Sequence, residues 1–145
     1  MEELINRMKV VLATSYAFQL KAHNYHWNVE GINFPQYHSF FGNLYEEVHD
    51  AVDSIAEHIR ALDGYAPGSF ERFKQLSSIT DETTIPSGQM MCQRLLNDND
   101  KVIQDLTFAY TEAERAKQLG LANFLQDRID IHQKHQWMLR SIVKG

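Results

Sequence analysis

Side chains of the types that bind transition metals are concentrated between residues 26 and 57. Imidazole nitrogens and carboxylate oxygens together suit iron, zinc or manganese. The stretch also contains Gly31 and Pro35, which mark the end of one helix and the start of another. It therefore predicts a transition-metal site that two helices position. The candidate ligands are His26, His38, His49, Asp53 and Glu57.

A helical wheel of the second of these helices separates an apolar arc from an arc of acids and histidine. With His38 at 0° and about 100° per residue, the apolar residues fall between roughly 240° and 340°, and the acids and His49 between roughly 20° and 120°. Solvated faces usually mix acids with Lys or Arg, whereas the first cation in this arc is Arg60. Without cations, the acids of this arc repel one another, and a bound metal cation would relieve that repulsion. The arc therefore has two interpretations, a metal site or a solvated polar face. The arc consists of Glu46, His49, Asp50, Asp53 and Glu57.

The spacing of the candidates along the helix limits how they can share an ion. His38 and Asp53 are fifteen residues apart, which is roughly 22 Å along one helix axis. Metal–ligand bonds are about 2 Å long, so these two side chains cannot hold one ion within a single helix. Either there are two separate sites, or two copies of the chain pack antiparallel about a two-fold axis. In the second case, His38 of one copy meets Asp53 and Glu57 of the other, and a tight connection after the first helix brings His26 to His38.

A di-iron site inside one four-helix bundle is the main rival. It requires a Glu from each of two helices and a Glu-x-x-His pair from each of the other two. Glu46 and His49 form one such pair, but residues 8–28 contain no acid and the last helix contains no Glu. The sequence therefore disfavours this site. His132 and His135 are expected to be ordinary buried or surface histidines rather than ligands.

Four long segments have apolar residues at helical spacing, which predicts an all-α fold. About 22 residues separate the second helix from the third, enough to cross the whole length of a bundle, so a ferritin-like four-helix bundle is favoured over an up-down bundle with short loops. A short helix over Ser69–Ser78 is expected inside this crossover, and Ser87 is expected to cap the third helix. The predicted helices cover about 4–29, 35–62, 88–117 and 121–143, with Gly120 separating the last two.

Length and composition predict one domain, residues 1–145, without a membrane span or a signal peptide. Cys92 is the only cysteine, so no disulfide forms within the chain and a cytoplasmic location is expected. The net charge is −5 and the sequence pI about 5.8. This balance argues against a protein that binds nucleic acid through its bulk charge.

The stretch HWNVEGINFPQYHSFFGNLYEEVHDAVDSIAE resembles the Dps family, the DNA-protection-during-starvation mini-ferritins. The resemblance rests on His-Trp-Asn at 26–28, His38 twelve residues after His26, and Asp53 four residues before Glu57, and it extends over essentially the whole chain. It implies a homododecamer, a hollow cage of four-helix subunits with iron-oxidising sites at its two-fold interfaces. His26 and His38 would come from one subunit and Asp53 and Glu57 from its partner.

By the same resemblance, iron is the metal (Fe2+ oxidised to Fe3+), hydrogen peroxide or dioxygen is the oxidant, and ferric mineral is stored inside the cage. The expected function is thus that of a ferroxidase, an enzyme of iron storage and detoxification. Trp27 would sit beside the site, either as an electron donor or as an aromatic that packs the dimer. Asn123 stands where an acid commonly lines the family's pores, and Asp127 lies one turn further on.

Three features depart from the family pattern. Gly42 stands where most members have a carboxylate, which predicts one tightly held ion and a second that is loose or bound through water. His23 stands where many members have Lys; it could be an auxiliary ligand, but a supporting hydrogen-bond donor outside the ligand set or an interface residue is favoured. The Lys/Arg-rich tail that several members use on DNA is missing, and twelve chains at −5 each would carry about −60 in all. The alternative function, a DNA-compacting structural protein with incidental iron oxidation, is therefore disfavoured, and DNA binding is expected to be weak or absent.

Overall fold

The computed structural model describes residues 1–145 and contains five helices and no strands. The all-α prediction is confirmed, and the short helix predicted inside the crossover is present. The helices are α1 (Glu2–Asn28), α2 (Phe34–Ala61), α3 (Phe70–Leu76), α4 (Gly88–Arg115) and α5 (Leu119–Lys144).

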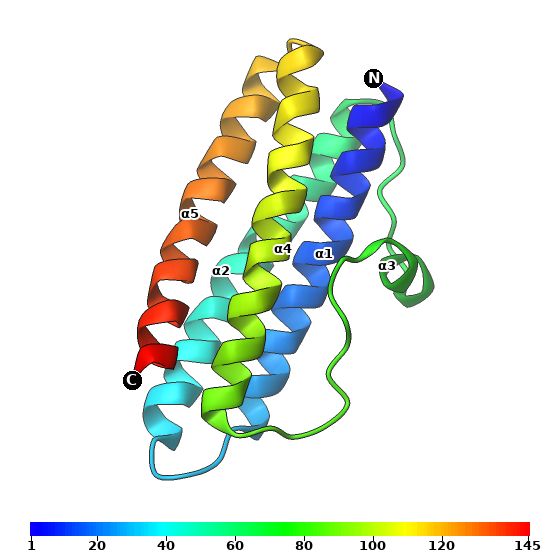
Figure 1. Cartoon of the computed structure of the whole chain (residues 1–145). Helices are drawn as coiled ribbons and strands as arrows, with labels where there is room; N and C mark the ends of the chain where they lie inside the picture. Colours follow the sequence, from blue (N-terminus) through cyan, green and yellow to red (C-terminus); the bar gives the residue numbers. More distant parts are fainter.

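The long crossover determines the direction of the helices (Figure 1). α1 and α2 run antiparallel through a short connection, and residues 62–87 then return along the bundle, so α4 runs in the same direction as α2. α5 runs antiparallel to α4 after a tight turn, and α3 lies outside the bundle beside α1. This is the arrangement expected of a ferritin-like bundle rather than of an up-down bundle.

The apolar arc of α2 faces the interior, as its helical wheel predicts. Phe41, Val48 and Ile55 are fully buried in the common core of the four long helices, whereas Asp53 and Glu57 are exposed. Since burial of a large apolar side chain stabilises a fold by about 1.5–3 kcal/mol, this stripe fixes the rotation of α2 about its axis. The same rotation directs the arc of acids and His49 away from the core.

Helix ends follow the sequence at some positions and not at others. Ser87 caps α4 as expected, because its hydroxyl accepts a hydrogen bond from the N–H of Met90 at 3.2 Å. The predicted break at Gly120 is wrong, because α5 already begins at Leu119. The chain turns instead at Lys117, whose φ of 57° is left-handed, and the Gln118 N–H then bonds to the carbonyl of Ala113 at 2.9 Å.

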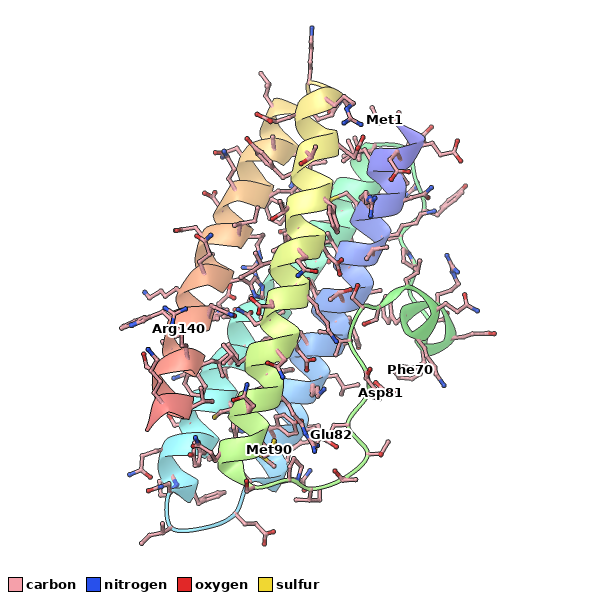
Figure 2. All side chains as sticks on the ribbon, viewed as in Figure 1. Met1, Phe70, Asp81, Glu82, Met90 and Arg140 are labelled. Atoms are coloured by element: carbon pink, nitrogen blue, oxygen red, sulfur yellow. The ribbon has the colours of Figure 1, made fainter.

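Buried polar contacts attach the crossover to the bundle. Glu82 accepts a hydrogen bond from the Tyr25 hydroxyl at 2.7 Å and pairs with Arg94, and in Figure 2 it lies on the connection that leads into α4. On the neighbouring turn of α1, Lys21 bonds to Asp98 at 2.8 Å and to the carbonyl of Thr80 at 2.9 Å. These contacts hold the crossover along α1.

None of the helices combines the length and the hydropathy that a membrane crossing requires.

Candidate metal centre

His26 and His38 lie together where α1 ends and α2 begins. The connection between the helices is short because Gly31 adopts a φ of 116°, which L-residues with a side chain rarely reach. The two imidazole rings stack with their centroids 3.8 Å apart and their planes 14° from parallel. The fold therefore brings this pair of predicted ligands together, as the sequence suggested.

Reciprocal hydrogen bonds orient the two rings. Nδ1 of His26 donates to the carbonyl oxygen of His38, and Nδ1 of His38 donates to the carbonyl oxygen of His26, each at 2.6 Å. A carbonyl oxygen can only accept, so each Nδ1 carries a proton, and in the neutral imidazole Nε2 is then the nitrogen with the lone pair. Outer hydrogen bonds of this kind fix the tautomer and the orientation of metal-binding histidines. Both residues are thus prepared to bind a metal through Nε2.

The His26 ring packs directly against α2 at Gly42. A Cβ at this position would lie 2.9 Å from both Cε1 and Nδ1 of His26, closer than real side chains approach. The absence of a side chain at Gly42 therefore allows the ring to reach the His38 carbonyl. Sequence reasoning treated this glycine only as a lost ligand and missed its steric role.

Asp53 and Glu57 are not brought to the histidines within one chain. Both are exposed on α2, which is continuous from Phe34 to Ala61, so the roughly 22 Å spacing from His38 to Asp53 holds in the structure. No three His, Cys, Asp or Glu side chains of one chain come close enough to hold a metal ion. One copy of the chain thus presents a histidine pair and a carboxylate pair that lie apart on α2 and at its start.

A row of aromatic and histidine rings lies beside the histidine pair. The His23 ring stacks on the Tyr45 ring with centroids 3.7 Å apart. The His23 ring also contacts the indole of Trp27, with ring centroids 3.9 Å apart. Tyr45 leads to His49, whose Nδ1 donates to Oε1 of Gln19 at 3.0 Å. Burial, followed by the nearby His26 and His49, lowers the pKa of His23. The neutral form of His23 is compatible with a residue that supports the site from outside the ligand set.

The interior of the bundle holds a polar network instead of a di-iron site. Glu47 pairs with Arg128 and accepts a hydrogen bond from Nε2 of His135 at 2.7 Å. Burial alone would raise the pKa of Glu47, but the hydrogen bonds from His135 and Arg128 outweigh it and lower the pKa to about 2. His132 donates from Nδ1 to Asn99 at 2.7 Å and accepts from Arg128 at 3.1 Å, and burial lowers its pKa well below the usual value.

The guanidinium of Arg128 occupies the place where a cation could sit among these groups. His132 and His135 are both buried. Glu46 and His49 are exposed, so the Glu46–His49 pair does not point into the bundle. The rival site inside the bundle is therefore wrong for this chain. Sequence reasoning missed Glu47, although Arg128, His132 and His135 share one face of α5 at helical spacing.

Comparison with known proteins agrees with the fold. Residues 5–145 match the family model of the ferritin-like domain. The DNA protection during starvation protein of Brevibacillus brevis is 30% identical over 142 residues, covering 97% of this chain and 93% of that protein. A low temperature-induced protein of Nostoc is 33% identical over 144 residues, covering 98% of this chain and 80% of that protein.

Solved structures give the same result. The crystal structure of Dps from Staphylococcus aureus has a TM-score of 0.94 at 26% identity, and the comparison covers 99% of this chain and 96% of that one. Sequence and structure thus agree over nearly the full length of both proteins. The chain belongs to the Dps family of ferritin-like proteins.

Proposed function

We propose that the protein is a ferroxidase that oxidises Fe(II) at sites shared by two copies of the chain and stores the ferric product inside a dodecameric cage. The observation that carries this proposal is that the candidate ligands form two separate pairs, one at the junction of α1 and α2 and one further along α2. His26 and His38 offer two oriented Nε2 lone pairs at one end, and Asp53 and Glu57 offer two exposed carboxylates at the other. Neither half supplies enough ligands alone, and together they match the preferences of ferrous iron.

A two-fold axis near the middle of α2 would join the halves. Two antiparallel copies of α2 would place His38 of each chain opposite Asp53 and Glu57 of the other, so every pair of chains would complete two equivalent sites. The carboxylates would neutralise part of the charge of the iron, while the imidazoles would hold it without adding charge. The exposed Trp27 would lie beside the site and close to His23.

Oxidation by peroxide requires two electrons. Two ferrous ions would each give one electron to one hydrogen peroxide, whose O–O bond breaks to yield two hydroxide ions or, with protons, water. Hydrolysis of the ferric ions then releases protons and forms the mineral. We place this activity in the cytoplasm, since the one cysteine, Cys92, is a buried free thiol.

The direct test is the rate of Fe(II) oxidation with hydrogen peroxide, and separately with dioxygen, followed by absorbance of the ferric product. The wild-type protein should oxidise iron faster than buffer, and His38→Ala and Glu57→Ala should each remove most of that difference. His58→Ala is the control, because His58 packs against Phe124 away from the site. Light scattering must show the same assembly size for each variant. Unchanged rates in both site variants would refute the assignment of the site.

A second candidate function, DNA protection by direct binding, is favoured by the name of the Brevibacillus brevis relative. The net charge of −5 per chain opposes it. Phosphate contacts through Lys and Arg supply most of non-specific DNA affinity, and that affinity falls steeply with salt. We expect no retardation of duplex DNA in a gel at about 150 mM salt. Retardation that survives this salt would establish direct binding.

A further inference from the structure

Gly42 leaves a gap in the row of ligands along α2. On the helical wheel that places His38 at 0°, Gly42 falls at roughly 40° and Asp53 at roughly 60°, so the glycine lies in the same arc as the ligands. It offers no donor atom to a metal. A side chain could not be added there without displacing His26, because the Cβ would lie 2.9 Å from that ring. Any replacement ligand must therefore come from elsewhere.

His49 is an imidazole in this arc that the site described above does not use. It is exposed, and it precedes Asp53 by one turn, just as Asp53 precedes Glu57 by one turn. Its Nδ1 donates to Gln19 at 3.0 Å, as the Nδ1 atoms of His26 and His38 donate to carbonyls. Nε2 of His49 has no hydrogen-bond partner in the chain, and in the neutral imidazole it is the nitrogen that can bind a metal on the exposed face.

The register of the proposed interface brings these two positions together. If His38 faces Asp53 and Glu57 of an antiparallel partner, the residue numbers of facing pairs add to about 91–95. The partner's His49 then faces residues 42–46 of the first chain, which is the segment that begins with Gly42. The segment that begins with Gly42, on which the His26 ring lies, and the partner's free imidazole are thus on the same level of the interface.

We propose that the partner's His49 supplies the ligand that Gly42 lacks and holds a second ferrous ion, with Asp53 shared between the two ions. The proposal rests on the interchain site proposed above. Four residues of helix rise about 6 Å, so His49, Asp53 and Glu57 form a ladder on one face that spans two ions about 3.5–4 Å apart. Two ions deliver two electrons to peroxide together. One ion alone would deliver one, and would release a hydroxyl radical beside the hydroxide.

The number of bound ions tests the proposal without relying on turnover. Calorimetric titration of the assembled, metal-free protein with Co²⁺ alone should give two ions per chain. His49→Gln keeps a polar side chain near Gln19 but removes the imidazole, and should retain one ion while the second binds about 100-fold more weakly. His58→Gln, which removes an imidazole on another face of α2, should still bind two. Spin trapping during Fe(II) oxidation by peroxide should detect more hydroxyl radical with His49→Gln than with His58→Gln.

The outcomes separate this proposal from the one on which it rests. If the wild-type protein binds one ion per chain, or if His49→Gln still binds two with unchanged affinity, while His38→Ala loses binding, then the role of His49 is wrong and the interchain site stands. If His38→Ala binds Co²⁺ as the wild type does, both proposals are wrong.

Discussion

Replacement of Gly42 by Ala tests how closely α2 must approach the His26 ring for that ligand to be oriented. The added Cβ would lie 2.9 Å from two atoms of the ring, so the ring must move. Movement breaks the bond from Nδ1 of His26 to the carbonyl of His38, now 2.6 Å long. Stability and metal binding should respond differently to this change.

The expected change in stability is small because two effects oppose each other. Alanine in a helix interior is favoured over glycine by about 1 kcal/mol. Loss of the hydrogen bond costs about 0.5–1.5 kcal/mol. The free energy of unfolding should therefore change by less than about 1 kcal/mol. Metal affinity should fall by about 10–100-fold, as it does when the partner that orients a histidine ligand is lost.

Thermal unfolding and Co²⁺ titration of the same preparations measure both effects, at one protein concentration because assembly adds to apparent stability. Gly120→Ala is the matched control. Gly120 is also helical, and a Cβ there would meet no atom within 4 Å, so this variant should gain stability and keep its metal affinity. If Gly42→Ala behaves like Gly120→Ala in both measurements, then the close approach at Gly42 does not position His26.

The buried network of the bundle gives two further predictions. Glu47→Gln should lower the free energy of unfolding by about 3 kcal/mol, because it leaves the charge of Arg128 uncompensated. This value is at the lower end for a broken buried pair, since the Glu47 side chain is 31% exposed. Chemical denaturation measures the change, and the control variant Glu46→Gln on the exposed arc should change stability by less than about 0.5 kcal/mol. Acid should destabilise the protein in two stages, which thermal unfolding at a series of pH values, monitored by circular dichroism, can measure. Below about pH 6.5 His132 takes up a proton in the unfolded chain but not in the folded one, where its pKa is lowered, so the folded state loses stability. From about pH 4.5 towards 2, Glu47 is protonated in the unfolded chain before it is protonated in the folded one, which lowers stability further. A Glu47→Gln variant that keeps the second stage unchanged would show that other carboxylates cause it.

The sequence predicted the features that depend on local pattern. The wheel of α2 correctly separated the buried stripe from the exposed acids, and the serine before α4 correctly marked its cap. The glycine rule failed at Gly120, because Lys117 adopts the left-handed conformation that glycine usually supplies. Asp63 does the same after α2. A pattern of residue types does not show which of several turn residues will adopt this conformation.

Features that depend on contact between distant segments were not predictable in the same way. The spacing of His26 and His38 suggested their proximity, but not the exchange of hydrogen bonds between their side chains and carbonyls, which forms where the end of α1 meets the start of α2. Glu47 carried no distinguishing signal, since its partners lie more than eighty residues away on α5. In the proposed function, the histidine pair and the carboxylate pair meet through a second chain, and the pattern of one chain does not describe that contact.

Complementation between two inactive variants tests the interchain site most directly. His38→Ala and Glu57→Ala proteins are dissociated, mixed in equal amounts and reassembled, and Fe(II) oxidation by peroxide is measured. Each mixed pair of chains would contain one intact site, with His38 from one chain and Glu57 from the other, and one site that lacks both. Random pairing makes half of the pairs mixed, so about one quarter of the wild-type activity should return. Activity that stays at the level of the separate variants would contradict a site shared between chains.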